Sequence, residues 1–253
     1  MRRTTLLAVA LGAAVCGMVA CSDSTTAPLV SDTELLQDVA SSSGDVIASE
    51  IGYLESSETD AGLASSSAPA AAEGSSGEIV RDRSHTCYDA DDVAQAECND
   101  TTTAKVVFHF EVDGSRSGTF FSAATHRVRD GVISGLLGHE TSRTHDAVGT
   151  ALDSLTFTTS AGSRSSVESA VDSVRALVFD LPHSTNPWPV SGMIVRNLSG
   201  TLTVAGTNRN GTLTYTRRVE VDFPADAEGN VTLHVNANTC NLNLVTHAVT
   251  GCH

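Results

Sequence analysis

Two strands and the turn between them can be read in residues 202–223, LTVAGTNRNGTLTYTRRVEVDF. In the second half every other residue belongs to one predominantly apolar face, which holds Leu213, Tyr215, Arg217, Val219, Val221 and Phe223. Threonine, arginine and acidic residues occupy the positions between them. This period of two is typical of a strand with one buried and one solvated face. Asn210-Gly211 favours the positive φ angles of a tight hairpin turn.

The same alternation extends in both directions from this hairpin. It recurs in 106–112 as Val-Val-Phe-His-Phe-Glu-Val and in 231–235 as Val-Thr-Leu-His-Val. Turn-forming residues separate the segments at 114–118 and 226–230. Consecutive hairpins with one apolar face predict a mainly β fold, an antiparallel meander forming a sandwich or an open half-barrel. One segment departs from the pattern: 165–178 has helical spacing after a capping box at Ser165 and Glu168, so we expect a helix that turns into a strand near Leu177.

Residues 32–54 predict an N-terminal amphipathic helical tether. Apolar residues such as Leu35, Val39 and Ile51 recur at helical spacing, and Thr33 is a candidate N-cap. Residues 41–44, Ser-Ser-Ser-Gly, interrupt the pattern, so we expect one or two short helices. They either pack on the main domain or bind a partner or a membrane surface. Residues 55–78 are rich in Ser, Ala, Gly and Glu, which is typical of a flexible linker.

The N-terminus has the pattern of an export signal. Arg2 and Arg3 precede an apolar run that ends in Met18-Val19-Ala20-Cys21. This end resembles the lipobox of bacterial lipoprotein precursors, which implies cleavage before Cys21 and attachment of acyl chains, including palmitate, to Cys21. A permanent membrane span or an ordinary signal peptide is the alternative. The predicted division is a signal peptide (1–20), a lipid-anchored tether with its linker (21–78) and a β-rich domain (79–253). Ser22 after the cysteine favours the outer membrane of the cell envelope.

Charge and cysteine content narrow the functional classes. The formal net charge is −15, so phosphate backbones repel the chain and a nucleic-acid partner is not expected. Anionic lipid repels it too, which leaves the lipid on Cys21 as the expected membrane contact. Four further cysteines in an exported chain predict disulfides, and the local pairings Cys87–Cys98 and Cys240–Cys252 are favoured. A four-cysteine zinc site is the disfavoured alternative, because no Cys-x-x-Cys spacing occurs.

A further resemblance rests on short motifs in 187–253. Pro187-Trp188-Pro189-Val190-Ser191-Gly192 is followed by Thr- and Arg-rich strands and by Cys240-Asn241-Leu242. This combination resembles a group of uncharacterised bacterial β-rich envelope lipoproteins. The resemblance implies a β-rich fold and assigns neither an activity nor a catalytic residue. We expect Trp188 to pack over a sheet edge.

No catalytic signature is present in the sequence. The Gly-x-Ser-x-Gly elbow, the P-loop and the dinucleotide fingerprint are all absent. His139 and His145 are six positions apart, which fits one metal ion only on an irregular loop. His85 lies near Cys87, whose predicted disulfide explains that cysteine better than a metal does. No cofactor and no resident metal are therefore expected. Weak calcium binding by the acidic segment 89–97 is a hypothesis, although the EF-hand pattern is missing.

The sequence favours a membrane-anchored envelope lipoprotein that is a non-catalytic binding or structural module. Its protein or small-molecule partner cannot be named from these residues. A lipid-tethered secreted hydrolase is one alternative. A carrier of a hydrophobic ligand under a β half-barrel is another, and a cavity lined by Phe108, Phe110, Tyr215 and Phe223 would favour it.

Overall fold

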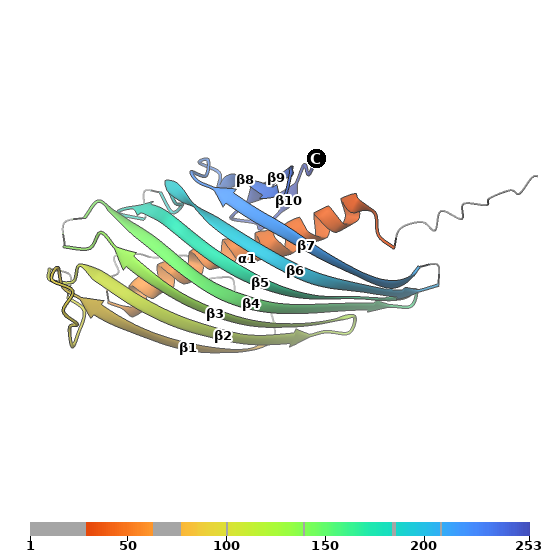
Figure 1. Ribbon diagram of the computed structural model, residues 1–253, viewed down its shortest axis with the longest axis horizontal. Coiled ribbons are helices and arrows are strands. Elements are labelled where there is room, and N and C mark those ends of the chain that lie inside the picture. The colour runs from red at the N-terminus through yellow and green to blue at the C-terminus, as the bar shows by residue number, and fades with distance from the viewer. Residues whose placement is uncertain (1–28, 63–76, 100, 139, 184–185, 208) are drawn as a thin grey trace, which may run out of the picture.

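The computed structural model describes residues 29–62, 77–99, 101–138, 140–183, 186–207 and 209–253. These residues form one helix, α1 (Asp32–Asp60), and a single ten-stranded sheet. The strands are β1 (Gly77–Tyr88), β2 (Lys105–Ser117), β3 (Phe121–Ser134), β4 (Ser142–Thr159), β5 (Gly162–Asp180), β6 (Ser191–Gly206), β7 (Asn210–Asp222), β8 (Asn230–Val235), β9 (Asn238–Asn243) and β10 (Val249–Thr250). Each strand pairs antiparallel with the next (Figure 1), so the predicted mainly β meander is confirmed.

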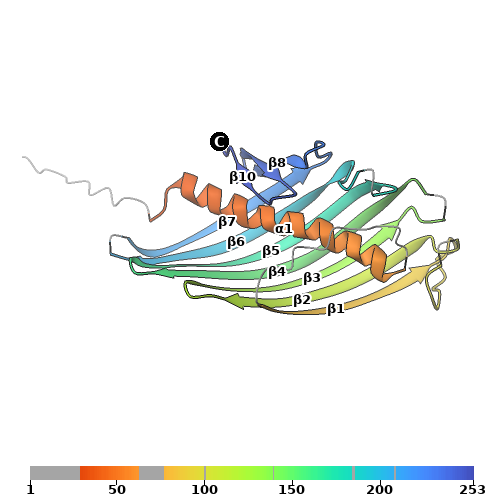
Figure 2. The same ribbon diagram turned by 180° about the vertical axis from the view of Figure 1, so that it is seen from behind.

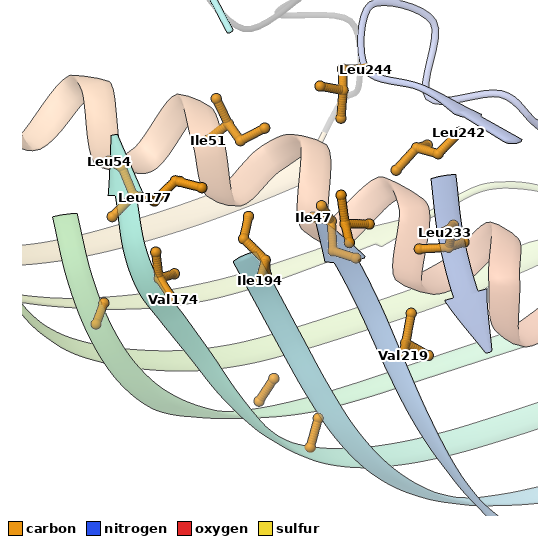
Figure 3. Packing of buried hydrophobic residues seen from close by; sticks show 14 of the residues in the cluster. Ile47, Ile51, Leu54, Val174, Leu177, Ile194, Val219, Leu233, Leu242 and Leu244 are labelled. Carbon is orange, nitrogen blue, oxygen red and sulfur yellow. The ribbon is translucent and has the colours of Figure 1, made fainter. Parts of the chain in front are cut away.

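The sheet is open, and α1 crosses one of its faces diagonally (Figure 2). We call the face under α1 the inner face and the opposite one the outer face. Ile47, Ile51 and Leu54 of the helix pack against inner-face side chains of the strands (Figure 3). Each of the three is at most 2% exposed. The helix therefore serves as the second layer of the core, which a sandwich would have supplied with a second sheet.

The helix is longer and more integrated than the sequence suggested. It runs unbroken for 29 residues, whereas we expected one or two short helices, and of the expected alternatives the structure shows packing on the main domain. Ser31 rather than Thr33 is the N-cap: the Glu34 amide donates to Ser31 Oγ, and the Ser31 amide donates back to Glu34 Oε2. This is a capping box, in which two otherwise unpaired amides gain partners.

Gly44 explains why the interruption at 41–44 does not break the helix. A Cβ placed on Gly44 would lie 2.8 Å from Val249 Cγ2 and 3.0 Å from Leu242 Cδ1. The missing side chain lets β9 and β10 approach the helix closely. The loss of helix propensity, about 1 kcal/mol relative to alanine, is thus offset by packing against the end of the chain.

The predicted linker is shorter than 55–78. Residues up to Asp60 belong to α1, and Glu55, Ser57 and Glu58 are buried against the sheet. At its other end, β1 begins at Gly77. The low hydrophobicity of residues 55–60, which suggested a linker, is explained by polar side chains that have buried partners. Glu58, for example, contacts Arg143, His145 and His183.

The helix predicted over 165–178 is wrong, because this segment belongs to strand β5. Val167 and Val171 point to the outer face and are 49% and 59% exposed, whereas Ala170 and Val174 are buried on the inner face. A bulge between Arg175 and Val178 shifts the register, which gives Leu177 an inner position three residues after Val174. The helix-like spacing therefore comes from a β-bulge and from apolar residues on the outer face.

The turns show one further difference. The connections after Gly206 and Asp222 lie where the turn residues predicted them. By contrast, the turn expected at 114–118 falls at 118–120, and Gly114 is part of β2. The amide of Gly118 donates to the carbonyl of Phe121 and closes this hairpin. Gly114 is therefore a strand residue and not a turn residue, and it lies beside the groove described below.

Candidate functional site

A row of side chains of alternating charge lies on the inner face under α1. Arg129 on β3 pairs with Glu50 of the helix at 2.9 Å and also with Asp172 on β5. Arg196 on β6 bridges Asp172 at 3.2 Å and Asp153 on β4 at 2.9 Å. Both arginine side chains are 1% exposed. Buried charges are tolerated when each has a partner of opposite sign, and this alternation supplies one to every member.

Within this row, the neighbouring charges shift the pKa values of Arg129 and Asp153. Burial lowers the pKa of Arg129, but Glu50 and Asp172 outweigh it, so the pKa is raised overall. Burial raises the pKa of Asp153, whereas Arg127, Thr125 and Arg196 lower it more strongly, so that carboxyl is held ionised. The charges fix how the helix sits on four strands, β3 to β6.

A second buried cluster fastens the C-terminal end of α1. Glu58, which is fully buried, contacts Arg143 at 2.6 Å and His145 Nε2 at 2.8 Å. His183 lies 3.5 Å from Glu58 and 3.6 Å from Glu55. The contacts with the carboxylates of Glu55 and Glu58 raise the pKa of His183 to about 9, although burial opposes them. His183 is therefore protonated at neutral pH.

Glu58 itself is held as an anion by its contacts with the two histidines and Arg143. Burial raises its pKa, but the contacts with His145 and His183 and the nearby Arg143 lower it far more. Phe179 contacts both imidazole rings, with ring centroids 5.3 Å apart in each case. The cluster is packed and almost fully buried, so we interpret it as a clamp between helix and sheet rather than as a reaction centre.

A groove of about 390 Å³ runs beside α1, over the inner face of β2 to β5. We call it the α1 groove. Val46 and Tyr53 of the helix and Val112 and Leu155 of the strands give it apolar walls. Gly114 lies in the wall at β2, where it adds no side chain.

Polar groups line one side of the α1 groove. Arg127 Nη2 pairs with Asp153 Oδ1 at 3.1 Å, and these side chains are 14% and 22% exposed. Glu168 accepts hydrogen bonds from the hydroxyls of Tyr215 at 2.6 Å and Ser42 at 3.3 Å. No histidine is among the described residues that line the groove. Apolar walls with a few placed polar groups are the usual composition of a small-molecule site.

The described cysteines among the predicted site residues do not line the α1 groove. Cys21 lies outside the described residues. The structure joins Cys87 to Cys98 and Cys240 to Cys252, with Cα–Cα distances of 5.3 and 4.1 Å, so both favoured pairings are confirmed. The first closes the connection from β1 to β2. The second ties the C-terminal residues to β9, and neither approaches the α1 groove.

The acidic segment considered for calcium uses its oxygens locally. Asp89 Oδ1 accepts from the amides of Asp91 and Val93, and Asp92 pairs with Lys105. These contacts stabilise the loop after β1, and the calcium hypothesis stays untested. His139 lies outside the described residues.

The aromatic residues considered for a carrier cavity are part of the core. Phe108, Phe110, Tyr215 and Phe223 are all buried in the cluster that α1 covers. Phe110 contacts Tyr53 of the helix, with ring centroids 5.3 Å apart. The space that a hydrophobic cargo would need is thus occupied by α1 in this arrangement.

Trp188, in the connection between β5 and β6, packs against the turn between β7 and β8, at the ends of the strands rather than over an edge strand. It is partly buried against the core. A Cβ on Gly229, which has φ +78°, would lie 3.0 Å from its ring. Glycine at this turn therefore serves both the backbone conformation and the contact with the indole.

Sequence reasoning missed the inner-face charges. Arg129, Asp172 and Arg196 resemble solvated residues when each is considered alone. Their signal was positional: each occupies a site in its strand that the alternation assigns to the buried face. A charge in an apolar register indicates a buried ionic partner.

Comparisons with known proteins give no relative for this chain. No family model, no curated protein and no solved structure matches it. Within the described ranges, no helix combines the length and the apolar character that a membrane crossing needs.

Proposed function

We propose that this protein is a membrane-anchored envelope lipoprotein whose folded part is a non-catalytic binding module, with the α1 groove as its ligand site. The single observation that carries the binding role is the groove itself. Its volume of about 390 Å³ lies within the range of roughly 300–1,000 Å³ that small-molecule sites occupy. The anchor rests on the lipobox-like segment that ends at Cys21.

The lining defines the chemistry of the ligand. Val46, Tyr53 and Leu155 suit a flat apolar body, and the carboxylates of Asp153 and Glu168 can accept a hydrogen bond from it. Arg127 is engaged by Asp153, whereas Glu168 accepts from the hydroxyls of Tyr215 and Ser42, so the polar side retains carboxylate acceptors and favours a hydrogen-bond donor over an anion. We therefore assign the site to a small amphipathic molecule with an apolar ring system and one or two hydrogen-bond donors.

The two buried charge clusters support a pre-formed site. They fix α1 on the sheet at Glu50 and at Glu58, on the same helix that supplies one wall of the groove. A wall held in place before the ligand arrives reduces the ordering cost of binding. The same rigidity disfavours a mechanism in which the helix leaves the sheet to admit cargo.

Fluorescence titration with N-phenyl-1-naphthylamine tests the site. This probe has a flat apolar body and one N–H donor. Ser49→Trp would fill the groove from the helix side and should weaken binding at least about tenfold, which corresponds to 1.4 kcal/mol. Ser41→Trp is the matched control, because Ser41 is exposed on the same helix and does not line the groove.

Two outcomes would overturn the assignment. One is that the probe fails to bind the wild-type protein. The other is that it binds Ser49→Trp and the control equally well, which would place the probe elsewhere on the surface. Turnover of an ester probe by the purified protein would instead favour the hydrolase alternative.

A further inference from the structure

The two ends of the sheet differ sharply in charge. Three hairpin connections lie at one end, between β2 and β3, β4 and β5, and β6 and β7, and we call it the tip end. The connections hold residues 118–120, 160–161 and 207–209, Gly-Thr-Phe, Ser-Ala and Thr-Asn-Arg, and contain no acidic residue. In a chain with a net charge of −15, an acid-free set of turns is a distinctive surface.

The connections at the opposite end carry the acidic side chains. In the described residues they hold Asp89, Asp91, Asp92, Glu97, Glu140, Asp226 and Glu228. An anionic lipid surface repels such an end. The acidic side chains near the tip end belong to the first turns of α1, where Glu34 and Asp38 pair with Arg209 and Arg164. The charge of the turns therefore favours the tip end as the one that approaches a membrane.

Exposed phenylalanines mark the tip end. Phe120 is 66% exposed, and Phe157, two residues before the end of β4, is 49% exposed. The Thr158 amide donates to the carbonyl of Phe120 at 2.8 Å, which ties the two hairpins together. Large apolar side chains beside uncharged turns are typical of a surface that enters the interfacial layer of a bilayer.

Helix α1 begins at the tip end (Figure 1). The first turns of α1 contact the tips, since Glu34 pairs with Arg209 at 3.4 Å and Asp38 pairs with Arg164. Leu29 lies against Gly211 at the start of β7. Leu29 lies eight positions after Cys21, and an extended chain of that length spans at most about 28 Å.

We propose that the tip end faces the lipid bilayer, with Phe120 and Phe157 at the headgroup layer and the acidic end directed away. This inference rests on the proposed lipid anchor at Cys21 and adds an orientation to it. Arg164 and Arg209 are paired with helix carboxylates, so the contact is apolar rather than electrostatic. It should therefore persist when the fraction of anionic lipid is changed.

Tryptophan quenching in vesicles tests the orientation with the full, lipidated chain. The native Trp188 is replaced in a Trp188→Phe background, and one tryptophan is introduced at Phe120 or, as a control, at Val245. Val245 is 63% exposed, and the adjacent Leu244 bonds to the turn at Gly229 at the acidic end. The vesicles contain phosphatidylethanolamine and phosphatidylglycerol, with or without brominated acyl chains.

We expect brominated lipid to quench Phe120→Trp at least about threefold more than Val245→Trp, because the quencher acts only near the bilayer. Phe157→Trp should behave like Phe120→Trp, which guards against misfolding of a single variant. Co-sedimentation with the vesicles is measured on the same samples. Protein that stays in the supernatant refutes the anchor, and the orientation falls with it. Sedimenting protein in which Val245→Trp is quenched as strongly, or in which neither tip variant is quenched, refutes the orientation alone.

Discussion

Replacing Arg129 by methionine tests whether the inner-face charges hold the helix on the sheet. Arg129 is 1% exposed, and it is the partner that Glu50 of α1 uses on the sheet, with two contacts of 2.9 and 3.0 Å. Glu50 is itself buried, at 3% exposed. Removing one partner of a buried ion pair costs about 3–5 kcal/mol, because the remaining charge is left desolvated. We expect a loss of that size in the free energy of unfolding.

The double variant Arg129→Met/Glu50→Met carries the sharper expectation. It removes both charges, and Asp172 keeps its contact with Arg196 at 3.2 Å. Replacing a whole buried pair by apolar groups of similar volume is often close to neutral. The double variant should therefore recover most of the stability that Arg129→Met loses.

Urea unfolding followed by circular dichroism measures these differences in a Cys21→Ser background, which carries no acyl chain. Lys105→Met is the matched control, since Lys105 and its partner Asp92 are 33% and 76% exposed. An exposed pair contributes about 0–1 kcal/mol, so this variant should unfold almost like the parent. The reasoning is refuted if the double variant is no more stable than Arg129→Met, or if Arg129→Met costs no more than the control.

Three further predictions follow from the helix, the anchor and the sheet. Because the pKa of His183 is raised from 6.5 to about 9, its protonated form stabilises the fold fully below pH 6.5, and this contribution is lost as pH rises through 9. The melting temperature should therefore fall between pH 6.5 and 9, and His183→Gln should flatten this dependence of melting temperature on pH. Cys21→Ser, once exported, should fractionate as a soluble folded protein, and continued membrane association would show that lipid is not the main anchor. Gly200→Ala should destabilise by about 1–3 kcal/mol, because its Cβ would lie 2.3 Å from the Tyr215 ring. Gly52→Ala, with nothing within 4 Å, should not destabilise in the same urea assay.

The strands were predictable because their outer face is solvated. On β7 the alternation of Tyr215, Val219 and Val221 with polar residues matches the observed burial residue by residue. Both disulfides were predictable for a related reason, since each closes a short loop between neighbouring elements. Local patterns suffice when the structure they describe is itself local.

The parts that failed depend on contacts between distant positions. Gly44 looks like a helix breaker until Leu242 and Val249 are placed beside it. Glu50 looks like a surface residue until Arg129, 79 positions later, is folded beneath it. The α1 groove was invisible for the same reason, because its two walls come from the first element of the fold and from the middle of the sheet.

The packing of α1 against the end of the chain has a consequence for biogenesis. The helix leaves the ribosome before any strand, yet its contacts include Val249, whose carbonyl accepts from Gln37 at 3.3 Å, and His247, 3.2 Å from Asp45. Such non-local closure makes folding slow, and the isolated helix is only marginally stable. A chain that stops before β10 (Val249–Thr250) lacks these contacts and leaves part of α1 uncovered. Closure of the core is thus a check that synthesis has continued through β10.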